Sequence, residues 1–222
     1  MKANFKFIFT MCLLFVSTLK LWAHDIYVDG IYYNYINDYK ELEVVAVGEN
    51  SRNIVIPETV VYANRERKVT SIAQGIFKSN SNLRSVSILC PIKEIETEMF
   101  VSCKSLKSVD LPNSVTKIGS SAFYDCTSLT SIVIPNSVTK IGSSAFFGCT
   151  SLTSIVIPNT TECIDTSAFS YCTALSSITI PEGVVKIGLQ AFWNCTSLIS
   201  VNIPNSVTII EDGAFYDCNY EV

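Results

Sequence analysis

The chain has 222 residues, of which 48% are hydrophobic and 16% charged, and its formal net charge is −4. This balance excludes a disordered chain, because disordered proteins combine low hydrophobicity with a high net charge. The basic residues form no stripe along the sequence, which argues against nucleic acid or an anionic membrane as a partner.

The first 23 residues have the features of a secretory signal peptide. Lys2 and Lys6 precede an apolar stretch over residues 7–16, and Ala23 is a small residue suited to cleavage. A membrane anchor is the alternative, but the apolar run is short for a bilayer span. Cleavage would leave 13 basic and 20 acidic residues, a net charge of −7. We predict export, either secreted or at the cell surface, with the periplasm as an alternative and no membrane span in the mature chain.

Residues 24–71 follow no period and are predicted to form an N-terminal β cap. Asp29 and Gly30 lie between alternating apolar residues, a strong signal for a β-hairpin. Residues 41–47 are predicted to be a third strand, and residues 54–57 the strand of an incomplete first repeat. Extra residues around positions 62–68 predict an inserted, protruding hairpin. Such a cap shields the open core end of a solenoid, although its five tyrosines also suggest a contact surface.

Residues 72–222 repeat with a period of 23, which is the signature of a solenoid. Cysteine follows all but the first of the repeated phenylalanines by three residues, and leucine follows the first six of them by six. The phenylalanines are Phe77, Phe100, Phe123, Phe146, Phe169, Phe192 and Phe215, and the cysteines are Cys103, Cys126, Cys149, Cys172, Cys195 and Cys218.

Each unit contains a short strand and a corner. Leu129, Ile132 and Ile134 alternate as the inward side of a strand, which Pro135 ends because proline has no amide hydrogen. A second extended stretch reaches residue 141, and Gly142 is predicted to permit the next corner. Residues 145–149 have the spacing of one helical or 3₁₀ turn. Stacked coils then form parallel sheets around a continuous core.

The unit IGSSAFYDCTSLTSIVIPNSVTK, residues 118–140, resembles the BspA-like leucine-rich repeats of bacterial surface proteins. The resemblance covers about two thirds of the chain. It implies a leucine-rich-repeat solenoid, mainly β, with parallel short strands, short helical or 3₁₀ turns and the β-hairpin cap. It also implies an adhesin that binds extracellular host proteins such as fibronectin and fibrinogen, or other cells. The family supplies no catalytic residues.

The cysteines are predicted to form an internal ladder of free thiols, since parallel side chains in a column are poorly placed for disulfides. Some disulfides remain the alternative. Cys90, in a turn, and Cys163, at a position where other units have lysine, depart from the pattern, either by incidental drift or as free thiols or cross-links.

No catalytic, cofactor-binding or metal site is predicted. The one histidine, His24, precedes the repeats, and the cysteines lack the close pairs that structural zinc requires. The acidic residues are scattered over different units, and no glycine-rich phosphate loop is present. The sequence therefore predicts a protein that is not an enzyme.

Two sets of outward residues are candidate binding sites. The first is the outward face of the repeat strands, which is predicted to be flat and weakly charged: Arg84, Lys107, Asp110, Thr130, Val133, Thr153, Val156, Ser176, Thr179, Ile199 and Asn202. The second is a ridge that follows the phenylalanines and is broken by Ser170: Tyr124, Phe147, Trp193 and Tyr216. Aromatic rings in such a ridge stack on sugars or anchor a protein, but more often they pack between coils.

We therefore predict an exported adhesion or recognition module that binds an extracellular or host protein. A glycan-capturing surface protein and a non-catalytic structural spacer are the alternatives. The sequence stops seven residues after Phe215, which leaves open a native cap, pairing with another molecule, or a fragment.

Overall fold

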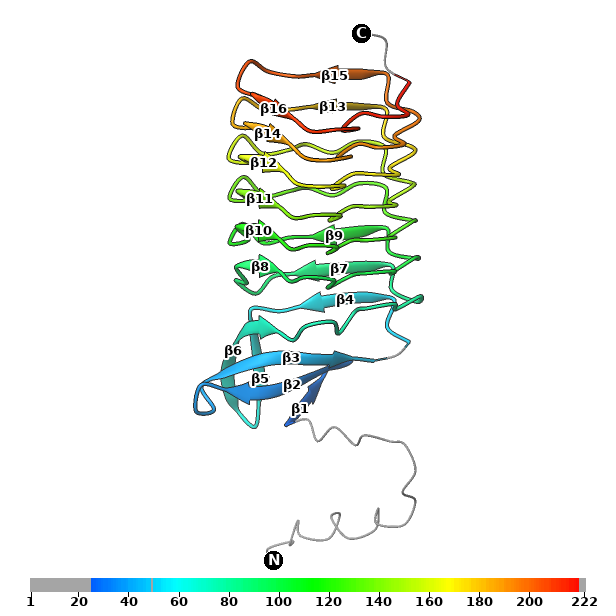
Figure 1. The fold of residues 1–222 in the computed structure, drawn as a ribbon. Helices are drawn as coiled ribbons and strands as arrows, with labels where there is room; N and C mark the ends of the chain where they lie inside the picture. Colours follow the sequence, from blue (N-terminus) through cyan, green and yellow to red (C-terminus); the bar gives the residue numbers. More distant parts are fainter. Residues whose placement is uncertain (1–24, 49, 220–222) are drawn as a thin grey trace, which may run out of the picture.

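The structure, a computed structural model that describes residues 25–48 and 50–219, is a solenoid of stacked coils with a small β-sheet at its N-terminal end (Figure 1). The predicted signal peptide lies outside the described residues. The cap contains β1 (Ile26–Val28), β2 (Ile31–Ile36), β3 (Glu41–Val47), β5 (Thr59–Tyr62) and β6 (Arg65–Ile72). Within residues 25–48 and 50–219, no helix is long and apolar enough to cross a bilayer.

The coils carry strands on two sides, as the repeat predicts. One side has β4 (Asn53–Ile56), β7 (Ser85–Ile88), β9 (Ser108–Asp110), β13 (Ser177–Thr179) and β15 (Ser200–Asn202). The other has β8 (Glu94–Ile95), β10 (Lys117–Ile118), β11 (Lys140–Ile141), β12 (Cys163–Ile164), β14 (Lys186–Ile187) and β16 (Ile209–Ile210), which form one continuous parallel sheet in that order. The first side is interrupted: β4-β7-β9 and β13-β15 are separate, with a single bridge between Val133 and Val156.

The seven repeated phenylalanines stack on one another through the core. Neighbouring ring centroids lie 4.9–5.3 Å apart and the ring planes are within 10° of parallel. The rings from Phe77 to Phe192 are fully buried, whereas Phe215 in the last coil is only partly buried. Each ring therefore buries its faces against the coils above and below, so that one coil has no complete core of its own.

The predicted helical turn is instead a chain of β-turns, and the described residues contain no helix. Ser144 and Gly148 have φ values of 55° and 70°, in the left-handed region that interrupts a helix. The amides of Ala145, Phe147 and Cys149 bond three residues back, whereas those of Ser144, Phe146 and Gly148 donate to carbonyls of the next coil at 2.8–2.9 Å. The corner therefore forms no helix, because every second amide donates its hydrogen bond to a carbonyl of the neighbouring coil.

Gly142 was expected to permit the corner, and it does so through close packing and not through a positive φ. The positive φ lies two residues later, at Ser144. A Cβ atom on Gly142 would instead lie 2.8 Å from the backbone nitrogen of Ser120, so the glycine allows close approach of two coils. Gly119 and Gly188 make the same close approach at the equivalent position of other coils, whereas Asp165 occupies that position in one coil.

The cap follows the predicted strands closely. β1 and β2 form a hairpin around Asp29 and Gly30, and β3 spans the predicted residues. β5 and β6 form the inserted hairpin, but it is more than a protrusion because β6 pairs in parallel with β3. The cap is consequently one five-stranded sheet in the order β1-β2-β3-β6-β5.

Candidate functional site

The eleven outward strand residues, which we call the strand face, are all exposed and lie in two columns. The first column contains Arg84, Lys107, Thr130, Thr153, Ser176 and Ile199. The second contains Asp110, Val133, Val156, Thr179 and Asn202. The structure therefore brings all of the predicted strand-face residues to one side of the solenoid.

Backbone hydrogen bonds hold the first column in register. The Lys107 amide donates to the Arg84 carbonyl at 2.8 Å, and each later amide in the column donates to the residue one coil earlier at 3.2–3.4 Å. The hydroxyls of Thr153 and Ser176 add longer contacts to the same carbonyls, at 3.5 Å. The spacing of these outward side chains is thus set by the stacking of the coils and changes little along the molecule.

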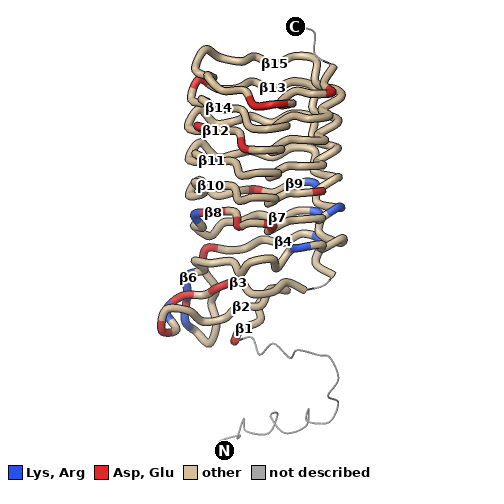
Figure 2. Tube along the Cα trace, viewed as in Figure 1, with Lys and Arg blue, Asp and Glu red and all other residues tan. Residues whose placement is uncertain are grey.

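The middle of the strand face is uncharged and apolar. Arg84, Lys107 and Asp110 lie toward its N-terminal end, whereas Val133 and Val156 at its centre are 82% and 79% exposed. Figure 2 shows charged residues in the cap and scattered over the coils, some of them at the edges, with long uncharged stretches between them. Several of those edge charges are already paired, as in Lys186 with Glu211 at 2.7 Å.

The strand face also has a cleft that the sequence did not predict. A cavity of about 350 Å³ lies beside Val156, Asn159, Thr179 and Pro181. It lies where the strand ladder is interrupted between Val156 and β13. The predicted flat surface is therefore hollowed next to its most exposed valines.

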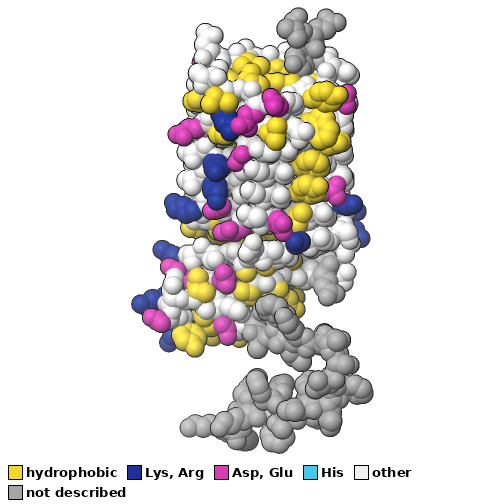
Figure 3. Space-filling view, in the orientation of Figure 1, with side chains coloured by type: hydrophobic (Ala, Val, Ile, Leu, Met, Phe, Trp, Pro, Cys, Tyr) yellow, Lys and Arg dark blue, Asp and Glu magenta, His cyan; other side chains and the backbone are white. Residues whose placement is uncertain are grey.

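The predicted aromatic ridge is present and is more continuous than expected. The rings of Tyr124 and Phe147 stack with centroids 4.7 Å apart, and the ring of Tyr171 lies 5.1 Å from Phe147 and 5.4 Å from Trp193. Tyr216 is 69% exposed at the far end. Figure 3 shows a stripe of hydrophobic side chains along one side of the coils.

Tyr171 is the residue that the sequence interpretation missed. Ser170 is not part of the ridge, because its side chain is buried in the core. Its hydroxyl donates a hydrogen bond to the Gln190 carbonyl. Tyr171, one position later, fills the gap from a backbone with φ of 60°, which is unusual for a bulky residue. The sequence does contain a signal for this, because the aromatic Tyr171 directly follows Ser170, the one non-aromatic member of the column.

The cysteine ladder consists of free thiols, each with a specific partner. Every thiol in the column donates a hydrogen bond to the phenylalanine carbonyl 26 residues earlier, for example Cys149 to Phe123 at 3.2 Å. The six distances range from 2.8 to 3.2 Å. Cysteine therefore fills a small apolar space and also satisfies a buried carbonyl group.

Burial makes the inner thiols poor nucleophiles. It raises the pKa of Cys103 to about 11 and that of Cys172 to about 12, from a usual value of 9. Cys90 is also fully buried, which removes it as a cross-link at the surface. Cys163 is partly exposed on β12, between Lys140 and Lys186 of the neighbouring strands.

Alkylation of the native protein with iodoacetamide is expected to label Cys163 and Cys218 and to spare the five inner thiols of the ladder. Both are partly exposed, whereas the inner thiols of the ladder are buried. The thiolate is the reacting species, so buried thiols with raised pKa values react slowly. Peptide mass spectrometry measures the pattern, with the protein unfolded in guanidinium as the control. Equal labelling of all seven in the native protein would contradict the buried ladder.

Two solved structures of bacterial proteins are similar to this fold. A leucine-rich repeat protein from Bacteroides ovatus ATCC 8483 has a TM-score of 0.72 and 28% identity, over 89% of this chain and 58% of that chain. The leucine-rich repeat protein of T. pallidum has a TM-score of 0.73 and 27% identity, over 83% of this chain and 85% of that chain. This chain thus spans less than two thirds of the B. ovatus protein. No curated protein matches the sequence.

The repeats themselves match a known family model. The model for the BspA type leucine rich repeat region matches residues 58–129 and 93–221, in six copies. The match begins at residue 58, directly before β5 and earlier than the predicted start of the repeats at residue 72, and it extends over most of the chain. Stacked phenylalanines, parallel short strands and the family match agree, and the chain belongs to the BspA-type leucine-rich repeat family.

Proposed function

We propose that this protein is an exported recognition module that binds another extracellular protein through its strand face. One observation carries the proposal: eleven outward side chains from successive coils form two exposed columns with exposed valines at the centre. Such a surface has the apolar centre and polar surround that recognition sites on proteins have. The cleft beside Val156 adds a recess for a partner side chain.

The low charge of the strand face favours a partner that binds by contact area. Between Thr130 and Asn202 none of its residues is charged, so long-range attraction to an oppositely charged partner is weak there. The hydroxyl groups of Thr130, Thr153 and Ser176 offer donors and acceptors around the valines. These features support a protein surface as the ligand, with hydrogen bonds at the rim.

Export and a binding role agree with what is known of the repeat. Leucine-rich repeats of this type are generally non-catalytic and occur in surface proteins. The N-terminal sequence features described above support a signal peptide, and we propose that the mature protein is secreted or held at the cell surface. A radiolabel or immunoblot comparison of cell and medium fractions, with N-terminal sequencing of the exported form, tests this assignment.

Introducing charge at the centre of the strand face is expected to abolish recognition without unfolding the protein. The purified protein is passed over immobilised extracellular matrix proteins and, separately, over a glycan array. For any protein ligand found, a double variant, Val133→Glu with Val156→Glu, is expected to weaken binding by at least tenfold, which is about 1.4 kcal/mol. The glutamates place charge on the apolar centre that the partner would have to desolvate.

The matched control is Lys140→Glu, an exposed position on β11 of the opposite sheet. It changes charge in the same coil as Val133 but on the other side of the core. Equal loss of binding in both variants would move the site away from the strand face. Failure to bind any matrix protein, with native spectra, would support the spacer alternative.

A glycan ligand is the second candidate, because Tyr171 keeps the aromatic ridge continuous between Phe147 and Trp193. Sugar binding that is lost in Trp193→Ala and Tyr171→Ala, and kept in the valine variant, would favour this candidate over the first.

A further inference from the structure

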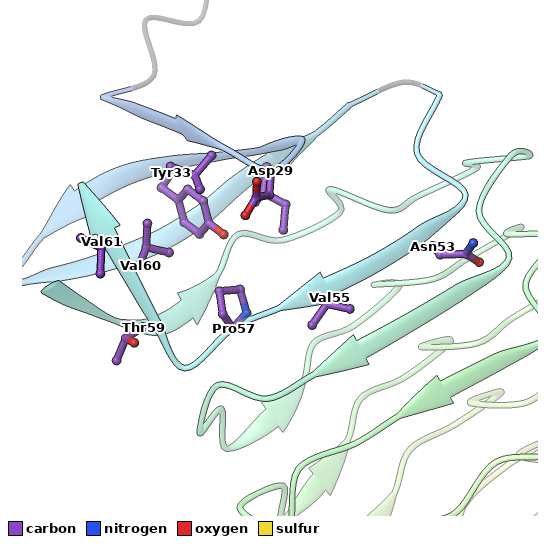
Figure 4. A pocket seen from close by; sticks show the side chains of 10 residues that line it. Asp29, Tyr33, Asn53, Val55, Pro57, Thr59, Val60 and Val61 are labelled. Carbon is purple, nitrogen blue, oxygen red and sulfur yellow. The ribbon is translucent and has the colours of Figure 1, made fainter. Parts of the chain in front are cut away.

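A cavity separates the cap from the first coil. Its volume is about 540 Å³, within the range of about 300–1,000 Å³ common for ligand sites. It is lined by the β1–β2 hairpin with Asp29 and Tyr33, by β4 with Asn53 and Val55, and by β5 with Val60 (Figure 4). We call this cavity the cap cleft.

One wall of the cap cleft is an open strand edge. β7 is the only strand that pairs with β4 among the described residues. The carbonyls of Arg52 and Ile56 accept hydrogen bonds from the β7 side, which places the backbone groups of residues 52, 54 and 56 toward β7. Successive residues of a strand point their backbone groups to opposite sides. The amides and carbonyls of Asn53 and Val55 therefore point toward the cap cleft.

The open edge is short and has defined limits. Pro57 follows β4 and has no amide to donate, so pairing by donation stops there. At the other end, the linker from β3 is tied to the β1–β2 hairpin, because the Gly48 amide donates to the Gly30 carbonyl at 2.8 Å. An added strand would find two residues of β4 with free backbone positions. This is enough for a short extended peptide and too little for a further coil of the solenoid.

The lining mixes aliphatic and polar side chains and has one charged group. Val28, Ile31, Val55 and Val60 supply aliphatic surface, and the carboxylate of Asp29 is the only formal charge among the lining residues. Figure 4 shows the side chains of Asp29 and Tyr33 lying close together on the cap side of the cleft. Burial, and then the charge of Asp29, raise the pKa of Tyr33 to about 12, which agrees with this proximity. The phenol is therefore a neutral donor beside a carboxylate.

We propose that the cap cleft binds an extended peptide segment of a partner protein, which adds as a strand to the open edge of β4 and places a basic side chain beside Asp29. Strand addition supplies backbone hydrogen bonds, and pockets for alternate side chains supply selectivity. The aliphatic walls fit an apolar residue next to the basic one. This site lies at the N-terminal end of the same side of the solenoid, because Val55 is in register with Ser87 of β7 and Asp110 of β9, and none of the eleven strand-face residues lines it.

A random peptide display library panned on the purified protein tests the proposal. Enriched peptides are expected to have alternating aliphatic residues with one lysine or arginine. Their binding, measured by fluorescence anisotropy on synthetic copies, is expected to weaken at least tenfold in Val55→Pro. That change removes the one outward amide hydrogen of Val55 and leaves the bonds between β4 and β7 in place. Val55→Thr, which keeps the amide, is the matched control and is expected to bind within about twofold of the original.

A second variant tests the charge. Asp29→Asn suits the left-handed backbone at this position, where φ is 51°, and removes only the negative charge. This variant is expected to bind the basic peptides at least tenfold more weakly. Its binding of a peptide copy that has alanine in place of the basic residue is expected to be unchanged. Circular dichroism and melting temperatures confirm that both variants fold. Peptides that bind Val55→Pro as tightly as the original, or a panning that enriches none, would overturn the proposal.

Discussion

Replacing Phe146 with alanine is expected to lower the free energy of unfolding by about 3–5 kcal/mol, as for other buried phenylalanines. The ring is fully buried and contacts Phe123 at 5.1 Å and Phe169 at 5.3 Å between centroids. Its removal leaves a cavity in the middle of the core, and domains of this size are stable by about 5–15 kcal/mol. Urea denaturation followed by circular dichroism measures the loss.

Phe215→Ala is the matched control for this prediction. Phe215 stacks on Phe192 at 5.2 Å, but it lies in the last coil and is only partly buried. We expect Phe215→Ala to lower the free energy of unfolding by less than half as much as Phe146→Ala, because less of the Phe215 side chain is removed from water. Equal losses at the two positions would show that stacking between coils does not determine stability.

The protein is expected to lose stability steeply as the pH rises from 9 to 11. The inner thiols have pKa values raised by burial, to about 11 for Cys103 and about 12 for Cys172, while the same thiols in the unfolded chain titrate near 9. Below pH 9 both states hold the proton and the stability is fully present. Above it the unfolded state loses protons first, so each such thiol costs up to about 1.4 kcal/mol per pH unit.

Urea denaturation at pH 8, 9, 10 and 10.5 measures this dependence, and Cys172→Ala isolates the thiol contribution. The variant starts less stable at pH 8, because the Phe146 carbonyl loses its hydrogen bond from Cys172. As the pH rises, the free energy of unfolding of the variant is expected to fall less steeply than that of the original protein. The difference in slope is the contribution of one thiol. The other ionisable groups are common to both proteins, so their contributions cancel in the comparison. Parallel curves for the two proteins would rule out the buried thiols as the cause.

Much of the fold follows from the 23-residue period. The spacing of Phe123, Cys126 and Leu129, repeated in register, predicts stacked coils because equivalent apolar residues can be buried only against their counterparts. Alternation around Asp29 and Gly30 predicts the cap hairpin in the same way, since both signals are local in sequence. The strand-face residues also follow, because a strand alternates its sides residue by residue.

The sequence by itself determined the repeated unit, the inward residues and the outward columns, since each depends on short, regular spacings. Only the tertiary structure decided the rest, which depends on how neighbouring coils meet. The β-turns at Ser144 and Gly148, the entry of Tyr171 into the ridge and the thiol bonds to phenylalanine carbonyls all arise from contacts between coils. The open edge of β4 likewise exists because the cap sheet turns away from the first coil, and no local spacing encodes that angle.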